Sequence, residues 1–220
     1  MSAVAPEGLE ARLGRGLAAV GAPADDRAVD ALSGWLALHA RWSRAFNLTG
    51  TRDPVELVDR HLLDAAAVVP LLPPGSIADV GSGAGLPGLV VALLEPERPV
   101  TLVDSLAKRT RFLEEAVRVL GVRNVRIVTR RIEAWAVDPG SLPAAVLARA
   151  VAPLPRLAAL LAPLLSRGVR LLAMKGPGWA EEAEGLGPQW AITSVREYVL
   201  PADASTRTLV TVCARGEEEP

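Results

Sequence analysis

The segment from Ile77 to Gly88 constrains the fold more than any other part of the chain. A short apolar run, residues 77–80, leads into three alternating glycines and then into a second apolar run; the glycines are Gly81, Gly83 and Gly85. Glycine has no Cβ, so these positions can adopt a positive φ and let a ligand approach the backbone closely. The segment predicts a strand, a ligand-binding loop at the carboxyl end of that strand, and a helix.

The spacing of the glycines narrows the class of ligand that this loop is expected to bind. A dinucleotide-binding loop has the pattern G-x-G-x-x-G, but here the third glycine, Gly85, comes one residue early and Leu86 stands in its place. The pattern G-x-G-x-G preceded by an acid, here Asp79, is typical of S-adenosylmethionine-dependent methyltransferases. This cofactor carries no phosphate and needs no free helix N-terminus, and Asp79 is expected to face its ammonium group. A tight strand–helix turn without a ligand is the alternative interpretation.

Asp104 supports the cofactor interpretation. It closes the next apolar run, residues 100–104, one β–α unit after the glycine loop. A carboxylate at a strand end can accept hydrogen bonds from two ribose hydroxyls. We therefore expect Asp104 to bind the ribose of the cofactor.

The chain divides near residues 70–76, where three prolines and Gly75 interrupt a helical pattern. Before this linker, apolar residues recur at helical spacing, and Asp53 followed by Pro54 predicts a helix start. We predict a helical extension over residues 1–70, a methyltransferase domain over residues 76–215 and an acidic tail over residues 216–220.

After the linker, Val/Leu/Ile-rich runs alternate with helical patterns. Strands are expected near 76–80, 100–104, 125–129, 144–149 and 169–174, and helices near 88–94, 106–120, 154–165 and 178–186. The runs 192–200 and 208–213 are expected to form an antiparallel hairpin at the sheet edge. This order predicts an α/β, Rossmann-like class I methyltransferase fold with a seven-stranded, mostly parallel sheet.

Composition excludes several classes of protein. No apolar run reaches the roughly 18 residues of a membrane span, and charges at Glu7, Glu10 and Arg12 are untypical of a signal peptide. We therefore expect a cytoplasmic protein without a membrane partner. One cysteine, Cys213, and two histidines argue against a disulfide framework and a metal site.

Basic residues are concentrated in one part of a chain whose net charge is −1. Residues 108–131 contain eight Lys and Arg against two Glu, and a second basic set lies upstream of the glycine loop at Arg41, Arg44, Arg52 and Arg60. Such residues supply the phosphate contacts that give affinity for RNA. We predict RNA contacts at Arg123, Arg126, Arg130 and Arg131, with a solvated helix face as the alternative.

Several motifs in one order together resemble the bacterial ribosomal RNA small subunit methyltransferase G family, also called glucose-inhibited division protein B. The resemblance extends from about Asn47 to Gly176. Its motifs are Asn47-Leu48-Thr49, Arg60-His61-Leu62-Leu63-Asp64, the loop from Asp79 to Gly88, Asp104-Ser105 with Lys108-Arg109 and Phe112-Leu113, Arg149-Ala150, and Lys175-Gly176.

The resemblance implies transfer of a methyl group from S-adenosylmethionine to N7 of a guanine in 16S rRNA, as free RNA or within the 30S subunit. N7 carries an available lone pair in the neutral base, so this reaction needs no general base, and the chain shows no obvious nucleophile–base pair. We expect a monomer. The alternatives are a small-molecule methyltransferase with the same cofactor loop and a non-catalytic ribosome assembly factor.

The resemblance also implies roles for individual residues. Gly81 and Leu86 would contact the cofactor, and Ile132 and Glu133 its adenine, although Ile132 is also expected in the core and Glu133 can instead cap a short helix. Arg149 would lie at the cofactor and target pocket, or be a structural arginine paired with an acid. Lys175 would contact phosphate or the target base, or belong to the scaffold; with Arg149 it is our catalytic candidate.

The roles of four residues that precede the glycine loop are harder to assign. His61 and Asp64 share one helix face, for which we favour a structural role. Asn47 and Thr49 lie in a loop between helices, and an RNA contact there is an open hypothesis. Ala65 and Ala148 depart from the family, in which serine is expected at both positions, and this weakens any claim that these two positions bind a ligand.

Overall fold

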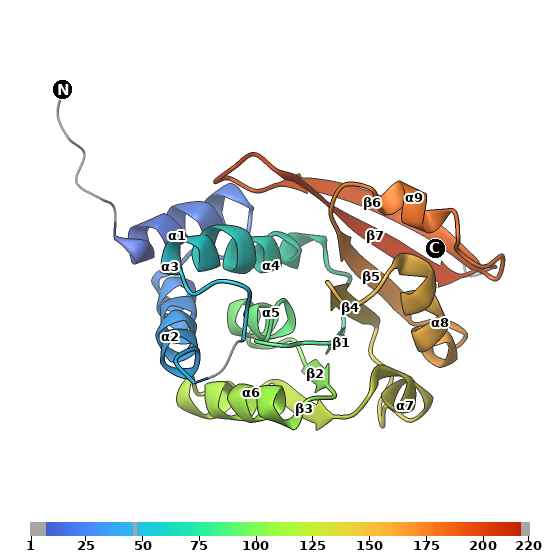
Figure 1. Cartoon of the computed structure of the whole chain (residues 1–220), viewed down its shortest axis with the longest axis horizontal. Coiled ribbons are helices and arrows are strands. Elements are labelled where there is room, and N and C mark those ends of the chain that lie inside the picture. The colour runs from blue at the N-terminus through green and yellow to red at the C-terminus, as the bar shows by residue number, and fades with distance from the viewer. Residues whose placement is uncertain (1–7, 46–47, 217–220) are drawn as a thin grey trace.

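A seven-stranded sheet organises the molecule (Figure 1). The computed structural model describes residues 8–45 and 48–216. The strand order is β3-β2-β1-β4-β5-β7-β6, in which β7 runs antiparallel to both of its neighbours and the other pairs are parallel. This confirms the predicted class I fold and the terminal hairpin. The strands are β1 Ile77–Val80, β2 Val100–Asp104, β3 Val125–Thr129, β4 Ala145–Arg149, β5 Arg170–Lys175, β6 Trp190–Val199 and β7 Thr206–Ala214.

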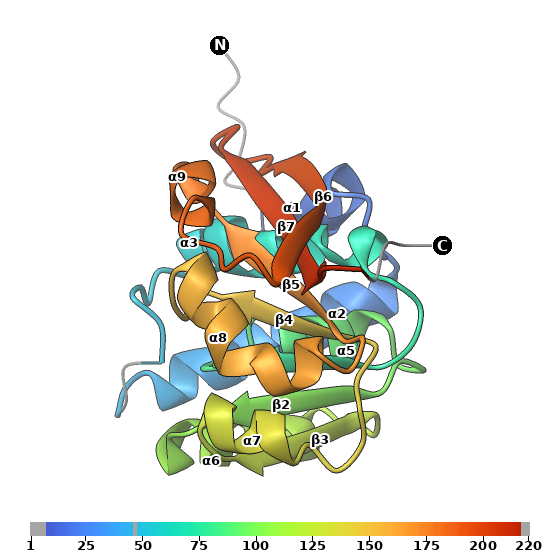
Figure 2. The ribbon, with the colours of Figure 1, turned by 90° about the vertical axis from the view of Figure 1, so that its right-hand side faces the viewer.

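Helices cover both faces of the sheet (Figures 1 and 2). One face packs against α5, α6 and the amino-terminal helices, and the other packs against α7 and α8. A parallel sheet needs both faces covered because its strands are apolar on both sides. The helices are α1 Leu9–Ala19, α2 Asp26–Trp42, α3 Pro54–Leu57, η1 Val58–Leu62, α4 Leu63–Ala67, η2 Val69–Leu71, α5 Gly88–Leu94, α6 Ala107–Val119, α7 Ile132–Val137, α8 Leu154–Leu165 and α9 Trp179–Ala183.

The amino-terminal helices share a hydrophobic core with the sheet. Leu13, Leu32 and Trp35 belong to the same buried cluster as Leu89 of α5 and Leu102 of β2. Burial of each such side chain stabilises the folded state by about 1.5–3 kcal/mol. The helices before the predicted boundary therefore pack as part of the core.

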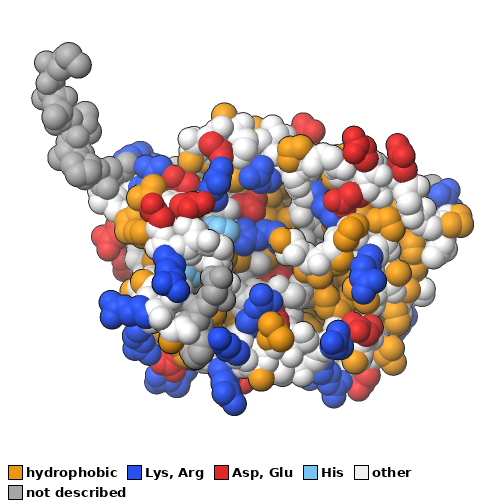
Figure 3. All heavy atoms as spheres, viewed as in Figure 1, with side chains coloured by type: hydrophobic (Ala, Val, Ile, Leu, Met, Phe, Trp, Pro, Cys, Tyr) orange, Lys and Arg blue, Asp and Glu red, His pale blue; other side chains and the backbone are white. Residues whose placement is uncertain are grey.

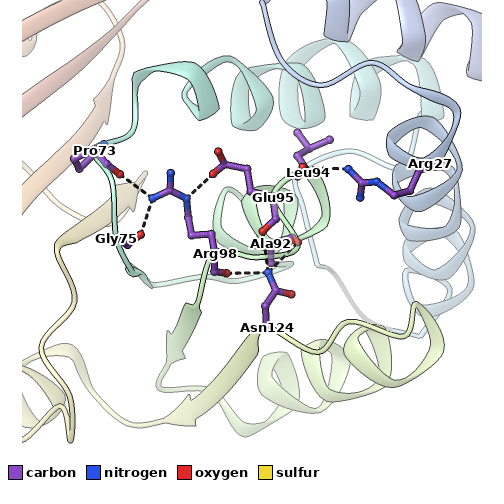
Figure 4. A network of polar contacts seen from close by, with 8 residues as sticks. All are labelled: Arg27, Pro73, Gly75, Ala92, Leu94, Glu95, Arg98 and Asn124. Atoms are coloured by element: carbon purple, nitrogen blue, oxygen red, sulfur yellow. Dashed lines mark hydrogen bonds and ion pairs between the residues drawn. The ribbon is translucent and has the colours of Figure 1, made fainter.

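Polar contacts fix the loops at the amino ends of the strands (Figure 4). Nδ2 of Asn124 lies within hydrogen-bond distance of the carbonyls of Ala92, Glu95 and Arg98, at 3.1, 3.1 and 2.9 Å. The Arg98 guanidinium donates to the carbonyls of Pro73 and Gly75, at 2.8 and 2.7 Å. The linker before β1 is thus tied to the loop before β2.

The helix after Asp53 differs from the regular helix that the sequence predicts. Asp53 caps it as expected, accepting from the backbone of Val55 at 2.8 Å. The next residues, Val58–Leu62, form a π-helix, in which the Leu63 amide donates to the Val58 carbonyl. Isolated π turns are often found at functional sites, and this one carries His61.

Parts of the sequence-based description lie outside the described residues: Asn47, and residues 217–220 of the acidic tail. Helix α9, Trp179–Ala183, is shorter than the predicted 178–186. No helix in the described part of the chain is long and apolar enough to cross a membrane.

Candidate active site

The glycine loop adopts the backbone that its sequence predicts. Gly81, Gly83 and Gly85 have φ of +71°, +55° and +87°. A Cβ at Gly81 would lie 2.7 Å from Cγ2 of Val151, and one at Gly85 would lie 2.6 Å from Cβ of Leu89. Glycine is therefore required by conformation and close packing at Gly81 and Gly85, and by conformation at Gly83.

Ser82, which the sequence interpretation did not single out, braces the loop. Its side chain is buried, and its hydroxyl donates to the Asp79 carbonyl at 2.8 Å. The Gly81 amide donates to the Val103 carbonyl at 2.8 Å, which ties the loop to the end of β2. A small hydroxyl residue between two glycines was the available signal for this role.

Asp104 lies at the end of β2 with its carboxylate directed at backbone amides. Its Oδ2 accepts from the Gly83 amide at 2.9 Å, and its Oδ1 accepts from the Leu106 amide at 2.9 Å. Arg109 adds a longer contact at 3.4 Å. A carboxylate has about four acceptor sites, so Asp104 can hold the loop and still accept hydrogen bonds from ribose hydroxyls.

A cavity of about 220 Å³, here called the cofactor cavity, opens beside Asp104. It brings together four of the predicted cofactor residues: Gly81, Asp104, Ile132 and Glu133. Ile132 is half-buried against the core and Glu133 is exposed. Leu86 is buried in the core and does not line the cavity. The full lining is Gly81, Asp104, Ser105, Arg109, Arg131, Ile132, Glu133, Val151, Arg156 and Leu160.

Asp79 is buried beneath the glycine loop. Its Oδ2 accepts from the Gly88 amide at 2.9 Å, at the start of α5, whereas its Oδ1 has no hydrogen-bond partner. Burial raises the pKa of Asp79 to about 7, and the Gly88 hydrogen bond opposes this shift. Asp79 is almost fully buried and does not line the cofactor cavity, but a buried carboxylate oxygen without a partner can pair with a cationic group.

A second cavity, of about 450 Å³, lies at the carboxyl ends of β4 and β5 and is here called the target cavity. Val151 lines both cavities, so they adjoin at this residue. Figure 3 shows basic and acidic side chains gathered around a hollow in the middle of this face. The target cavity is lined by Asp64, Arg149, Ala150, Val151, Ala152, Pro153, Met174, Lys175, Gly176, Glu182, Tyr198 and Arg207.

Arg149, one of the two catalytic candidates, is held by a buried carboxylate. Its Nη1 donates to Oδ2 of Asp64 at 3.0 Å, and Oδ1 of Asp64 accepts from the Tyr198 hydroxyl at 2.8 Å. Nδ1 of His61 lies 3.4 Å from Nη2 of Arg149. Arg149 is therefore both a cavity-lining residue and a member of an ion pair, which combines the two roles considered from the sequence.

Burial sets the charge states around Arg149. Burial lowers the pKa of His61, and the charge of Arg149 lowers it further. Burial raises the pKa of Tyr198, as does the neighbouring Asp64 carboxylate. Both groups are therefore neutral at pH 7, and Asp64 and Arg149 carry the opposite charges of this network.

Lys175, the second catalytic candidate, is also paired. Its Nζ donates to Oε2 of Glu182 at 2.6 Å and to the Ala152 carbonyl at 3.0 Å. The Lys175 hydrogen bond lowers the pKa of Glu182. Lys175 thus presents a fixed positive charge at the wall of the target cavity.

Three cavity residues were missed or left open by the sequence interpretation. Asp64 belongs to one of the family motifs, but the sequence did not indicate which residue it contacts. Tyr198 and Glu182 were not considered. Asp64 contacts both Arg149, 85 residues further along the chain, and Tyr198, 134 residues further along. No local sequence pattern signals such contacts.

The four arginines predicted to bind RNA do not form one patch. Arg123 and Arg126 line a pocket at the amino end of β3, together with Asn124 and Pro99. Arg130 and Arg131 follow the carboxyl end of β3, and only Arg131 lines the cofactor cavity. Arg126 lies within β3, and three strand residues, 127–129, separate it from Arg130, about 13 Å of extended chain.

Thr49 and His39 form a partly buried polar contact, and neither residue lines the cofactor cavity or the target cavity. The Thr49 hydroxyl lies 3.0 Å from Nε2 of His39 and donates to the Thr51 carbonyl at 2.7 Å. Burial lowers the pKa of His39 to about 4.

The positions that depart from the family, Ala65 and Ala148, are buried core residues. Within residues 8–45 and 48–216, no group of three His, Cys, Asp or Glu is placed to hold a metal ion.

Solved structures with this architecture are methyltransferase-like. A ribosomal protein L11 methylase from Lactobacillus delbrueckii subsp. bulgaricus superposes with a TM-score of 0.52 at 16% identity, over 74% of this chain and 79% of the other. A protein called MtNAS, in complex with MTA and tNA, superposes with a TM-score of 0.55 at 16% identity, over 81% of this chain and 70% of the other. At such identities the likeness concerns the fold.

Relatives found by sequence share a higher identity with this chain than these solved structures do. Proteins named ribosomal RNA small subunit methyltransferase G are 46% identical in Halorhodospira halophila, over 87% of this chain and 90% of the relative, and 42% identical in Chromohalobacter salexigens, over 91% and 95%. The sequence model of that family matches residues 28–210. This confirms the resemblance found in the motifs: the chain belongs to the rRNA small subunit methyltransferase G family.

Proposed function

We propose that this protein transfers a methyl group from S-adenosylmethionine to N7 of a guanine in 16S rRNA. The observation that carries the proposal is the junction of the cofactor cavity and the target cavity at Val151, in a chain of this family. A methyl donor in one cavity and a base in the other would meet at the carboxyl edge of the sheet, where open α/β sheets bind their ligands.

The residues present fit S-adenosylmethionine, which supplies an electrophilic methyl group when bound. Asp104 offers acceptors for ribose hydroxyls, and a Cβ at Gly83 would meet only the Gly81 carbonyl oxygen, at 3.8 Å. Asp79 offers a buried carboxylate to the ammonium group. We assign cofactor contacts to the predicted set Asp79, Gly81, Gly83, Gly85, Leu86, Asp104, Ile132, Glu133 and Arg149; for Gly85 and Leu86, which are packed into the core, the role is to shape the loop.

The protein's contribution to the reaction is positioning. Guanine N7 has a lone pair, so no side chain has to remove a proton, and alignment of reacting groups supplies about 7–11 kcal/mol of a barrier. Arg149 and Lys175 would hold the target base or its phosphate, since each is fixed by a carboxylate and cannot turn away. Their fixed charges favour an anionic or strongly polar partner over a hydrocarbon.

The substrate must present an unpaired guanine. In an A-form helix the N7 edge lies in a groove that side chains cannot enter, so the target lies in a loop or in an incompletely assembled subunit. We assign backbone contacts to Arg130 and Arg131, beside the cofactor cavity, and more distant contacts to Arg123 and Arg126. We further propose that the protein acts as a monomer in the cytoplasm, with residues 76–215 as the catalytic domain and residues 1–70 as its helical extension.

The test is transfer of a tritiated methyl group from S-adenosylmethionine to 16S rRNA and to 30S subunits that lack the modification. We expect label at one guanine N7 with the wild type, and loss of most label with Asp104→Ala. Asp30→Ala, an exposed carboxylate on α2, is the matched control and should retain activity. Cofactor binding without transfer to either RNA would refute the proposal and favour a small-molecule substrate or an assembly role.

A further inference from the structure

The target cavity has two carboxylates, and their surroundings differ. Both oxygens of Asp64 are engaged, one by Arg149 and one by Tyr198, and its side chain is 8% exposed. Glu182 has only Oε2 engaged, and its side chain is 36% exposed. Within the described residues, no hydrogen bond reaches Oε1 of Glu182. Glu182 therefore has an acceptor available to a ligand in this cavity.

The orientation of Glu182 is fixed by two donors on the same oxygen. The Leu154 amide, at the start of α8, donates to Oε2 at 3.0 Å, and Nζ of Lys175 donates to it at 2.6 Å. These contacts join three segments: the end of β5, the start of α8 and helix α9. Because the pKa of Glu182 is lowered by Lys175, the group is an ionised, acceptor-only carboxylate at neutral pH.

An acceptor-only group distinguishes the two purines. The Watson–Crick edge of guanine presents N1–H and the 2-amino group, both donors, whereas adenine presents an unprotonated N1 acceptor and carries its amino group at C6, with only a hydrogen at C2. The N7 atom lies on the opposite side of the purine. A carboxylate placed at the 2-amino group therefore selects guanine and leaves N7 free.

We propose that Glu182 is a specificity-determining residue that selects guanine by accepting a hydrogen bond from its N2 amino group at Oε1. This inference rests on the function proposed above, because it requires a guanine in the target cavity. It assigns to Lys175 the additional task of orienting Glu182. Asp64, with both oxygens engaged, positions Arg149 instead.

The test compares guanosine with inosine at the methylated position. That position is first mapped with the wild type, and 16S rRNA carrying either nucleoside there is then prepared by ligation. Inosine lacks the 2-amino group and keeps N7, so it removes the proposed contact alone. For the wild type we expect kcat/KM on the inosine RNA to be about 10- to 100-fold lower, the range for one hydrogen bond to a charged group.

The decisive variant is Glu182→Gln. The two donors on Oε2 would draw the amide oxygen to that side, leaving its NH₂ group at the position of Oε1, where it opposes the guanine amino group. We expect activity on guanosine RNA to fall and the difference between the two RNAs to shrink to within about threefold, because only the hydrogen bond to guanine is lost. Glu182→Asp retains the charge beside Lys175, but its shorter side chain moves the carboxylate oxygens away from the cavity. This variant should also lose the discrimination between guanosine and inosine RNA.

Glu181→Gln, an exposed neighbour on α9 that does not line the cavity, is the matched control and should keep the wild-type discrimination. An equal loss on both RNAs in the Glu182 variants would indicate a purely structural role and overturn this inference alone. Wild-type protein that methylates no guanosine RNA would overturn the proposed function and this inference together.

Discussion

The two ends of the sheet use charged and polar side chains in different ways. At the amino end, Asn124 and Arg98 direct donors at backbone carbonyls of neighbouring loops, and Arg98 also pairs with Glu95, a pair that lines neither the cofactor cavity nor the target cavity (Figure 4). At the carboxyl end, Arg149 and Lys175 pair with carboxylates, and both pairs line a cavity. The amino-end contacts join loop to loop and lie outside both cavities, so we expect them to stabilise the loops only. The carboxyl-end ion pairs leave polar groups on a surface that a ligand can reach, so they can also bind.

The largest effect is expected from Arg149→Lys at the carboxyl end. Lysine keeps a positive charge beside Asp64 but lacks the planar guanidinium fork. We expect kcat to fall about 100-fold, typical of removing one donor that acts on the reacting group, with a melting temperature near that of the wild type. The measurement is tritiated methyl transfer per folded molecule. Arg167→Lys, exposed beyond α8, is the control; a kcat within threefold of wild type for Arg149→Lys would place Arg149 with the structural arginines of the amino end.

The opposite outcome is expected from Asn124→Ala at the amino end. This variant leaves up to three loop carbonyls without their side-chain donor. We expect a loss of about 2 kcal/mol in the free energy of unfolding, since each hydrogen bond contributes about 0.5–1.5 kcal/mol. Urea denaturation measures the loss, and kcat of the folded fraction should be unchanged. A large fall in kcat at unchanged stability would contradict the division between the two ends.

Asp79→Asn tests the buried carboxylate with a pH dependence. Because the folded-state pKa of Asp79, about 7, lies above its ordinary value of 3.8, the folded protein binds this proton more tightly than the unfolded chain. The contribution of Asp79 to stability is therefore greatest below pH 3.8, falls as the pH rises from 3.8 to about 7, and is constant above. Asparagine keeps an acceptor for Gly88 and carries no charge at any pH.

The asparagine variant should consequently gain stability relative to the wild type between pH 5 and pH 8. We expect a gain of about 1–2 kcal/mol, below the roughly 4 kcal/mol that a shift of about three pKa units corresponds to. Urea unfolding at the two pH values measures it. Asp30→Asn, the same change at an exposed carboxylate of α2, is the control. A difference between Asp79→Asn and wild type that is independent of pH would contradict an ionisable Asp79.

The smallest effects are expected from paired arginine substitutions at the two ends of β3. Arg130→Ala with Arg131→Ala should weaken RNA binding about three- to tenfold at physiological salt, and should lower the slope of log affinity against log salt by about one to two. Arg123→Ala with Arg126→Ala should have less effect, since that pair lies at the amino end. Filter binding over a salt series measures both. Equal losses would show that RNA extends along β3 to both ends of the sheet.

Local sequence patterns determined the order of strands and helices and the residues at strand ends. Alternating apolar runs predict β–α units, and the structure places Asp104, Arg149 and Lys175 at the carboxyl ends of β2, β4 and β5. Those ends share one edge because parallel strands run in one direction. The glycine spacing likewise predicted the positive φ values of the loop. These features depend on neighbours along the chain, which a sequence displays.

The tertiary structure alone decided which charges meet. Asp64, in helix α4 after the π-helix Val58–Leu62, reaches Arg149 at the end of β4, and Tyr198 reaches Asp64 from β6, two strands beyond β5. It also divided the basic residues that the sequence places together: Arg123 and Arg126 line a pocket at the amino end of β3, whereas Arg130 and Arg131 follow its carboxyl end. Such contacts depend on strand order and helix packing, which are set by burial of the whole core rather than by any local pattern.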